Sequence, residues 1–382
     1  MKIAITTDAI WPYTIGGSEL RNQEIGKRLV KKGHEVHIYG AKLWEGPDII
    51  KQEGVIIHGV CYFNEGLYKH NGKRSSLDPL KLSIKLYHKI SKEKFDIVNN
   101  LSFTFFNCFA TKLYTIKTKT PLVLTWQQFF GDYLLGYFGK VNGNIARTLE
   151  FISTKLTKNH IAVSHFVKKE LTKRNVNPKN IKVIYNGADV KSIKKIPNQK
   201  KIYDLVFVGR LNYQKNISLL IKSIKEVKKI YPTISLALIG GGEDKEKLIN
   251  LTNELGLEKN IKFFGKINDR TKLYKLIKSS EIFTLPSVLE GFPLTIIEAN
   301  ACGLPAISTK TKHNNTTEHL NECGISTNPN SKDFSKAIIK LLKDKKLREK
   351  YAKISGKKSD EFDWDKITDQ EEKYYLKILK KF

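Results

Sequence analysis

The 382-residue sequence has no hydrophobic run long enough to cross a membrane. A transmembrane helix needs roughly 18 or more consecutive apolar residues, and no stretch reaches that length. Residues 1–8 are too few and too strand-like for a signal peptide. We therefore expect a cytoplasmic protein, with any membrane contact peripheral and on the inner face of the membrane.

Cysteine is also scarce. The four cysteines, Cys61, Cys108, Cys302 and Cys323, are far apart and form no Cys-x-x-Cys pair. This spacing excludes a disulfide framework and a cysteine-based zinc site, and it predicts free thiols. No Asp-x-Asp string lies in a strand context suited to a metal, so we predict no metal site.

Acidic residues are outnumbered: 38 Asp and Glu face 67 Lys and Arg, a net charge of +29. The excess is even, because residues 1–190 carry 29 basic and 15 acidic side chains and the remainder carries 38 and 23. It reflects either a lysine-rich composition or a functional basic surface facing an anionic membrane. The predicted helix at 79–92 has a lysine side and an apolar side, which suits either a solvated surface helix or lipid docking. No nucleic-acid-binding motif is present, so we predict no nucleic acid partner.

The length suits two domains of about 190 residues each. Predicted strands alternate with predicted helices, and the pattern starts again after a polar stretch, which favours an α/β class. We predict an N-terminal acceptor-side domain at 1–190, a linker at 191–201, a C-terminal domain at 202–360 and a final helix at 361–382.

Residues 286–303 carry the strongest chemical signal. A buried strand is predicted at 281–285 and a helix at 294–302. Free backbone N–H groups at such a helix start bind anions, phosphate above all. Glu290 precedes the helix and Glu298 lies within it, and ionised carboxylates accept hydrogen bonds from sugar hydroxyls. An ordinary strand–helix unit with two surface glutamates is the plainer reading of that pair alone.

The fuller string, Glu290-Gly-Phe-Pro-Leu-Thr-Ile-Ile-Glu298-Ala-x-Ala-Cys-Gly, closely resembles the nucleotide-sugar motif of glycosyltransferase family 4. These are retaining enzymes of the GT-B fold, in which two Rossmann-like domains with parallel sheets face each other across a cleft. The resemblance implies that Glu298 binds the nucleotide ribose and Glu290 the donor sugar. It also implies that the segment between them holds the sugar and diphosphate, with the contacts at Gly291, Phe292, Pro293, Leu294 and Thr295. The final helix at 361–382 is implied to cross back to the first domain.

A second match follows the strand predicted at 204–209. Gly209-Arg210 and, five residues later, Lys215 resemble the diphosphate-binding pair of the same family. The resemblance implies that Arg210 and Lys215 neutralise the leaving diphosphate. A solvated cation pair in a lysine-rich loop is the alternative.

Two weaker matches complete the predicted donor site. Gly16 and Gly17 follow the first strand, and the resemblance implies contact with the donor diphosphate and sugar from the opposite domain. Without the family resemblance, the two glycines predict only a tight turn. Ile267 follows another strand and is implied to contact the nucleobase.

One departure from the family stands at Gln127. The strand at 120–125 is followed by Trp126 and Gln127, where the family usually has a histidine that contacts the transferred sugar. Glutamine donates and accepts hydrogen bonds but cannot carry a proton in catalysis. No other histidine has the local context to replace it.

We therefore predict a metal-independent, retaining hexosyltransferase. It moves a sugar from a nucleotide diphosphate sugar, UDP- or GDP-linked, to an acceptor hydroxyl in glycan, glycolipid or cell-surface polysaccharide biosynthesis. The acceptor is a glycan, a lipid-linked molecule or a small molecule, and no cofactor is expected. The predicted catalytic residues are Arg210, Lys215, Glu290 and Gln127.

Three rival functions are weighed against this one. A catalytically degenerate sugar-nucleotide-binding or scaffold protein of the same fold is the main alternative, supported by Gln127. A nucleotide-sugar epimerase is disfavoured by the paired glutamates at 290 and 298. A nucleic-acid binder has only the net charge in its favour.

Overall fold

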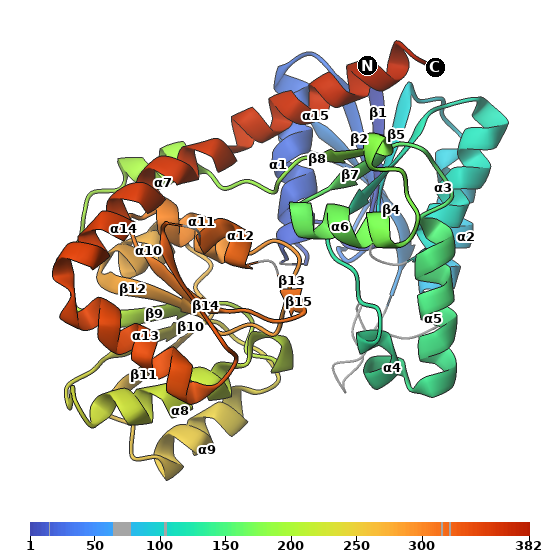
Figure 1. Ribbon diagram of the computed structural model, residues 1–382. Helices are drawn as coiled ribbons and strands as arrows, with labels where there is room; N and C mark the ends of the chain where they lie inside the picture. The colour runs from blue at the N-terminus through green and yellow to red at the C-terminus, as the bar shows by residue number, and fades with distance from the viewer. Residues whose placement is uncertain (15, 64–77, 103–104, 315, 321) are drawn as a thin grey trace. The chain divides into compact units, whose positions relative to one another are not determined.

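The computed structural model describes residues 1–14, 16–63, 78–102, 105–314, 316–320 and 322–382, which form two compact units (Figure 1). Unit 1 comprises Met1–Asn186 and Trp364–Phe382, and unit 2 comprises Gly187–Asp363. The C-terminal helix therefore belongs to the unit that holds the N-terminus. Among the described residues, no helix is both long and apolar enough to span a bilayer.

Unit 1 is built on an eight-stranded sheet in the order β3-β4-β2-β1-β5-β6-β7-β8. Every neighbouring pair is parallel except β3 and β4, which are antiparallel. The strands are β1 (Lys2–Thr6), β2 (Glu35–Lys42), β3 (Ile49–Gln52), β4 (Val55–Tyr62), β5 (Ile97–Leu101), β6 (Leu122–Trp126), β7 (His160–Ala162) and β8 (Ile181–Val183).

The core of unit 1 explains why the two ends of the chain meet. Ile3 and Ile5 of β1 are buried in one cluster with Leu29 of α1, and Trp364 and Tyr375 of α15 belong to the same cluster. Burial of these large apolar side chains holds α15 against α1 (Figure 1). The helices of unit 1 are α1 (Gly17–Lys31), α2 (Asp78–Ile90), α3 (Phe105–Thr118), α4 (Tyr133–Phe138), α5 (Lys140–Ser153), α6 (His165–Lys173) and α15 (Trp364–Leu379), with the 3₁₀ turn η1 (Pro178–Asn180).

Unit 2 has a six-stranded parallel sheet in the order β11-β10-β9-β12-β14-β16, together with a short pair, β13 and β15. Its central strands are buried along most of their length, as expected when helices cover both faces of a parallel sheet. The strands are β9 (Tyr203–Val208), β10 (Leu236–Ile239), β11 (Ile261–Gly265), β12 (Ser280–Leu285), β13 (Leu289–Glu290), β14 (Ala306–Thr309), β15 (His313–Asn314) and β16 (Gly324–Thr327).

The helices of unit 2 include one where the sequence predicted a linker. Val190–Lys195 forms α7 because Asp189 caps it and Val190 and Ile193 are buried. The whole 191–201 stretch lies within unit 2. The helices are α7, α8 (Ile217–Lys228), α9 (Lys245–Glu254), α10 (Arg270–Lys278), α11 (Leu294–Ala301), α12 (Thr316–Leu320), α13 (Ser331–Lys343) and α14 (Lys345–Lys358), with the 3₁₀ turns η2 (Tyr213–Lys215) and η3 (Ser359–Phe362).

Several elements were not expected from the sequence. The antiparallel strand β3, the short β13–β15 pair, and the helices α4 and α5 have no counterpart among the elements predicted from the sequence. The four cysteines are buried free thiols, in agreement with their spacing.

Candidate functional site

Glu290 and Lys215 lie in direct contact in unit 2, although 75 positions separate them in sequence. Glu290 ends β13 and is 7% exposed. Its Oε1 accepts hydrogen bonds from the Lys215 ammonium and from Ser287 Oγ, the latter at 2.8 Å. Lys215 ends the 3₁₀ turn η2 that follows β9. The structure therefore joins a cation and a carboxylate, both predicted from separate motifs, at the carboxyl ends of neighbouring strands.

A small network holds the Glu290 loop in place. β13 pairs with β15, and Asn314 of β15 donates from Nδ2 to the carbonyl of Ser287 at 2.7 Å. The N–H of Val288 donates to the carbonyl of Gln214 at 2.8 Å, which ties this loop to the loop that carries Lys215. The two loops are therefore positioned by backbone as well as by the ion pair.

Glycines allow the neighbouring turns to stack closely. A Cβ added at Gly240 would lie 1.8 Å from the carbonyl oxygen of Gly209, and one at Gly242 would lie 2.3 Å from that of Leu211. Both residues also have φ in a region that L side chains rarely adopt, +142° and +158°. Glycine at 240 and 242 is therefore required by the packing of the loops after β9 and β10.

Arg210 and Ile267 occupy the same edge of the unit 2 sheet. Arg210 follows β9 and is exposed, while Ile267 follows β11 and is half-buried. Both positions follow the carboxyl ends of parallel strands, where open α/β sheets bind ligands.

Glu298 of α11 is held by two residues that the sequence analysis did not identify. Arg270 Nη2 donates to Glu298 Oε1 at 2.5 Å, and the Tyr274 hydroxyl donates to the same oxygen at 2.9 Å. Arg270 and Tyr274 are one turn apart on α10 and also contact each other. Burial, followed by the Glu298 charge, raises the pKa of Tyr274 well above its usual value, so the phenol stays a donor. These contacts converge on Oε1 and orient the carboxylate.

The start of α11 is partly engaged within the chain. The N–H of Leu294 donates to the carbonyl of Phe292, and that of Ile296 donates to the carbonyl of Pro293, each at 3.0 Å. These N–H groups at the helix start therefore already have partners, which leaves fewer backbone donors for the anion contact predicted at 292–295. The Phe292 ring packs against His319 and Phe362 at 4.7 and 5.9 Å between ring centroids, so its side chain anchors the loop.

In unit 1, Gly16 and Gly17 form the start of α1. Gly16 is its N-cap with extended backbone, and Gly17 is its first residue. A Cβ at Gly16 would lie 2.3 Å from the Glu19 carboxylate, the end of a flexible side chain that can move aside, so neither crowding nor backbone strain requires glycine there. This places a helix N-terminus at the carboxyl end of β1, where the sequence predicted donor contact.

Gln127 follows β6 and is fixed by a chain of polar contacts. Its Oε1 accepts from Asn186 Nδ2 at 2.8 Å, and Asn186 Oδ1 accepts from Arg21 Nη1 at 2.9 Å. Arg21 is 1% exposed and pairs at 2.5 Å with the equally buried Glu371 of α15. Because arginine only donates, it sets the orientation of the Asn186 amide, which in turn sets that of Gln127.

This orientation leaves the Gln127 amide nitrogen available. Gln127 Nε2 is buried and has no hydrogen-bond partner in the described structure. The nearby His160 cannot substitute for the missing histidine, because Trp126 Nε1 donates to its Nδ1 at 3.1 Å and its Nε2 contacts the Thr157 carbonyl. The unpaired donor at Gln127 is thus a polar group of unit 1 that lacks a partner within the protein.

The loop after Gln127 is fastened by Glu150 of α5. Its carboxylate accepts from the N–H of Phe130 at 2.8 Å and from Arg174 at 3.3 Å. Arg174 also lies over the Phe129 ring at 4.1 Å. These contacts fix the segment that follows β6.

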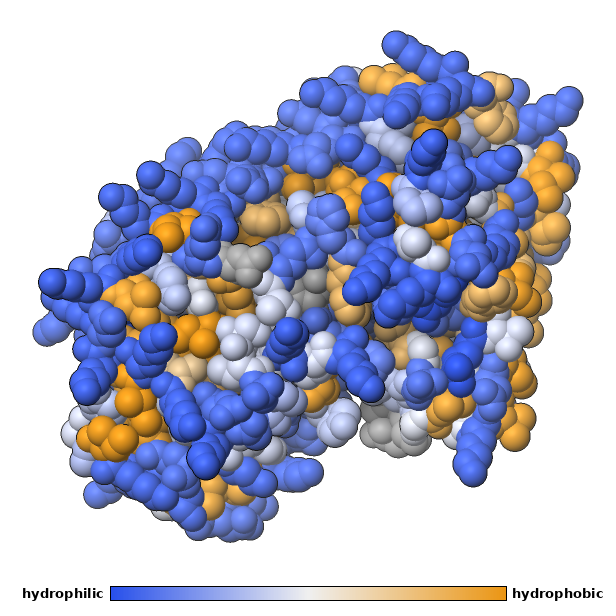
Figure 2. Space-filling view, viewed as in Figure 1, coloured by the Kyte–Doolittle hydropathy of each residue, from blue (hydrophilic) through white to orange (hydrophobic). Residues whose placement is uncertain are grey.

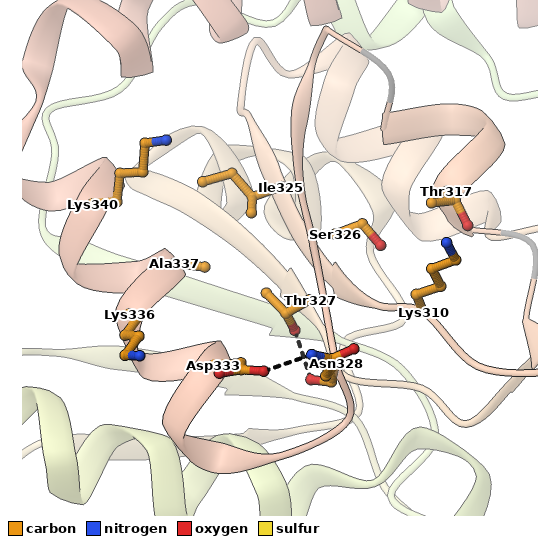
Figure 3. Close-up of a pocket in the computed structure, with 10 residues that line it drawn as sticks. All are labelled: Lys310, Thr317, Ile325, Ser326, Thr327, Asn328, Asp333, Lys336, Ala337 and Lys340. Atoms are coloured by element: carbon orange, nitrogen blue, oxygen red, sulfur yellow. Dashed lines mark hydrogen bonds between the residues drawn. The ribbon is translucent and has the colours of Figure 1, made fainter.

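A separate cavity of about 510 Å³ lies beside β16 in unit 2 (Figure 3). Lys310, Lys336 and Lys340 line it together with polar residues of β16 and the following turn, and Asn328 donates to Asp333 at its rim. None of the predicted site residues lines this cavity.

Family profiles match nearly the whole chain. The profile described as Glycosyltransferase Family 4 matches residues 15–192, and that described as Glycosyl transferases group 1 matches residues 189–358. The chain belongs to glycosyltransferase family 4. The resemblance drawn from residues 290–303 is therefore confirmed, and this family 4 protein is a glycosyltransferase.

Similar proteins match most of the length of this family 4 glycosyltransferase. The capsular polysaccharide biosynthesis glycosyltransferase CapH of Staphylococcus aureus is 27% identical over 372 residues, covering 94% of this chain and 95% of CapH. An Escherichia coli enzyme named UDP-Gal:alpha-D-GlcNAc-diphosphoundecaprenol alpha-1,3-galactosyltransferase is 29% identical over 290 residues, covering 72% and 73% of the two chains.

Solved structures establish the fold. Sucrose-phosphate synthase of Thermosynechococcus elongatus matches with a TM-score of 0.83 at 17% identity, and 100% of each chain is covered. Anabaena HepE, solved in complex with UDP-glucose, matches with a TM-score of 0.74 at 17% identity and the same coverage. This family 4 glycosyltransferase therefore has the GT-B fold, as predicted.

Proposed function

We propose that this glycosyltransferase transfers a sugar from a nucleotide diphosphate sugar to an acceptor hydroxyl with retention of configuration and without a metal ion. The observation that carries the proposal is the contact of Lys215 with Glu290 at the carboxyl edge of the unit 2 sheet. It joins a diphosphate-binding cation to a sugar-binding carboxylate in one small site. Retention is the expectation that comes with the family.

The chemical demand of the reaction is to stabilise a departing diphosphate. Lys215 and the exposed Arg210 follow β9 and supply positive charge, and preorganised charges of this kind lower the barrier where negative charge develops. When the diphosphate binds, Lys215 shares its ammonium between Glu290 and the phosphate oxygens. Glu290 then orients the sugar through its hydroxyl groups and is not assigned as a nucleophile.

Glu298 is proposed to hold the ribose. Arg270 and Tyr274 both bind its Oε1, which turns the carboxylate and leaves its second oxygen as the acceptor for ribose hydroxyls. Ile267, three residues before Arg270, is proposed to contact the base. This arrangement makes Arg270 and Tyr274 positioning residues for nucleotide binding.

Gln127 is proposed to contact the transferred sugar through Nε2. That nitrogen is buried and unpartnered, and it is held in place through Asn186. A sugar hydroxyl would satisfy it, whereas no proton transfer is possible at this position. Binding of a nucleotide sugar without any turnover would instead favour a degenerate sugar-nucleotide-binding protein.

The relatives guide the choice of substrates. HepE was solved with UDP-glucose, and the Escherichia coli relative is named for UDP-galactose and a diphosphoundecaprenol-linked acceptor. CapH is named for capsular polysaccharide biosynthesis. We therefore propose a UDP-linked donor ahead of a GDP-linked one, and a lipid-linked glycan acceptor in polysaccharide or glycolipid synthesis.

A lipid-linked acceptor calls for a membrane contact, and one face of unit 1 suits it. The neighbouring helices α2, α3 and α5 expose Ile84, Leu113, Ile116, Val141 and Ile145, each more than half exposed. Exposed lysines and Arg147 lie on the same helices. Figure 2 shows apolar atoms along the edge where Figure 1 places these helices. Interleaved apolar and basic side chains favour peripheral binding to anionic lipid on the cytoplasmic side.

The donor site is tested by a thermal-shift screen against UDP-, GDP-, ADP- and dTDP-sugars. Wild type, Glu298→Ala and Glu254→Ala are compared, since Glu254 is an exposed glutamate on α9. A shift with one nucleotide that is lost only in Glu298→Ala supports the proposal, and donor hydrolysis then tests turnover. No shift with any donor in a folded protein would overturn it.

The membrane contact is tested by flotation with phosphatidylcholine vesicles, with and without phosphatidylglycerol. We expect flotation only with the anionic lipid and its loss in the double variant Val141→Glu, Ile145→Glu. Equal flotation of wild type and variant would contradict this face. Ile230→Glu, at an exposed apolar position of unit 2, serves as the control.

A further inference from the structure

Two histidines and a glutamate meet in unit 1 away from every residue discussed above. His37 lies in β2, His58 lies in the neighbouring strand β4, and Glu93 lies in the turn before β5. His37 Nδ1 is 2.8 Å from His58 Nε2 and 3.7 Å from Glu93 Oε1, and the three atoms all lie within 4.8 Å of one another. The parallel register pairs Tyr39 with His58, which puts both on the sheet face that carries His37. Gln127 follows the carboxyl end of β6, whereas this cluster lies toward the amino-terminal ends of β1 and β2.

Hydrogen bonding fixes the ring nitrogens of the pair. Glu35 Oε1 accepts from His37 Nε2 at 2.8 Å, so in the neutral form of the His37 ring the Nδ1 lone pair faces His58. The His58 Nε2–H then donates to that lone pair. Both rings are buried, with Tyr39 stacked on His58 and the Phe95 edge against His37.

The glutamate is also oriented toward the rings. Lys2 Nζ binds Glu93 Oε2 at 2.8 Å, which leaves Oε1 facing His37 and the Tyr39 hydroxyl, the latter at 3.3 Å. Burial raises the pKa of Tyr39, so its phenol remains a donor to this carboxylate. The Glu93 side chain is 30% exposed, which provides solvent access on its side of the cluster.

We propose that His37, His58 and Glu93 bind a divalent transition-metal ion, with zinc as the best fit. Two imidazole nitrogens and one carboxylate oxygen are typical zinc ligands, and the fourth position takes a water molecule from the exposed side. With bonds of about 2.0–2.1 Å, tetrahedral ligand atoms lie about 3.3 Å apart. The 2.8 Å nitrogen pair therefore has to open by about half an ångström, while the 3.7 Å contact closes by about as much.

The ion takes the place of one ring proton. His58 moves its hydrogen from Nε2 to Nδ1, the other neutral tautomer, so no proton has to leave the protein. Glu35 already accepts from His37 Nε2, the outer contact that metal-binding histidines usually make. Lys2 keeps its bond to the second oxygen of Glu93. Bound metal would tie β2, β4 and the turn before β5 together, so its role is structural and is independent of the proposed transfer reaction.

The test uses tag-free, full-length protein from which metal has been stripped by a chelator. Calorimetric titration with zinc chloride should show one ion per chain with a dissociation constant in the micromolar range or below. Cobalt(II) should give the visible absorption of a four-coordinate site. Zinc should raise the unfolding temperature of wild type, because it binds only the folded cluster.

Variants locate the site. His58→Gln should abolish saturable binding, and Glu35→Gln should weaken it by about 10- to 100-fold. His88→Gln, at an exposed histidine of α2, should bind as wild type does. If His58→Gln does not fold, Glu93→Gln at its partly exposed position replaces it. The proposal is overturned if wild type shows no saturable binding, or if zinc binds the ligand variants as tightly as wild type.

Discussion

The two units hold their predicted substrate groups in different ways. In unit 2 the groups are ions in pairs, Lys215 with Glu290 and Arg270 with Glu298. In unit 1 the group is the neutral Gln127, and the nearest ion pair is two contacts away and fully buried. A partly exposed charge can exchange partners with a ligand, whereas a buried charge that loses its partner is strongly destabilising. We therefore expect the charges of unit 2 to serve the substrate and the buried pair of unit 1 to serve stability.

The largest expected effect is on the stability of unit 1. Arg21→Met leaves the buried Glu371 carboxylate without its cationic partner, and should lower the free energy of unfolding of unit 1 by about 3–5 kcal/mol. Urea unfolding followed by tryptophan fluorescence measures this unit alone, because all four tryptophans, Trp11, Trp44, Trp126 and Trp364, lie in it.

The control for this experiment is Arg147→Met, which removes a half-exposed arginine paired with Asp132 and should change stability little. If Arg21→Met cost no more than Arg147→Met, the structural role assigned to the buried pair would be wrong.

The next effect is on catalysis in unit 2. Lys215→Ala removes the cation that contacts Glu290 and should lower kcat by about a hundred- to a thousandfold, the usual loss when one preorganised charge-stabilising group is removed. Steady-state transfer with the donor found by the screen measures it. Lys222→Ala, an exposed lysine on α8, should keep the wild-type rate. A normal kcat in Lys215→Ala would show that the contact between Lys215 and Glu290 is not needed for sugar transfer.

A smaller effect is expected at Glu298, the carboxylate proposed to bind the ribose. Tyr274→Phe removes one of the donors to Glu298 Oε1, and a hydrogen bond to a charged group contributes about 1.5 kcal/mol or more, which corresponds to about tenfold weaker donor binding. Calorimetric titration with the donor, or with its free nucleotide, provides the measurement. Tyr231→Phe is the control, at a half-buried tyrosine after α8. Unchanged affinity in Tyr274→Phe would show that Glu298 does not need this orientation.

The sequence could group the candidate site residues where they are close together in the chain. Glu290 and Glu298 lie within one short motif, and the strand–loop–helix around them needs only local signals, a buried run followed by a turn and a helix start. Arg210 and Lys215 likewise follow one strand. The family motif and the alternation of strands and helices were sufficient to predict the fold class.

Side-chain contacts between separate segments of the sequence could not be predicted from local signals. Arg270 and Tyr274 form an ordinary pair one turn apart, and nothing in α10 indicates that both face Glu298. The series of hydrogen bonds that fixes Gln127 begins at Arg21. The ion-pair partner of Arg21, Glu371, is 350 positions from Arg21 in sequence. Such contacts depend on how strands and helices pack, so periodicity in one segment cannot predict them.

A pH effect is expected on the stability of unit 1. Burial lowers the pKa of His160 in β7 to about 4, whereas the unfolded chain titrates near 6.5. The unfolded state therefore takes up the proton first, so stability is full above pH 6.5 and falls as the pH drops toward 4. Between pH 7.5 and 5.5 this residue alone should lower the free energy of unfolding of unit 1 by about 1.3 kcal/mol.

Tryptophan fluorescence in urea at the two pH values measures this loss. The protein is kept metal-free, because His58 also titrates in unit 1. In His160→Gln the free energy of unfolding should fall less between the two pH values, by the about 1.3 kcal/mol assigned to His160. If His160→Gln and wild type lost stability equally, the buried histidine would not be the cause.

The smallest effect tests whether unit 1 binds the substrate through a neutral group, in contrast to the charged groups of unit 2. Gln127→Ala removes the unpartnered Nε2 donor, and one neutral hydrogen bond of about 1 kcal/mol corresponds to about a fivefold loss in kcat/KM. Gln128→Ala at the next position serves as the control, and Gln127→His restores the group usual in the family. A fivefold loss that histidine repairs would mean that a sugar hydroxyl is bound here by hydrogen bonding alone. A loss as large as that of Lys215→Ala would mean that the amide acts on the departing diphosphate as strongly as a cation does, and the division between a charged unit 2 and a neutral unit 1 would fail.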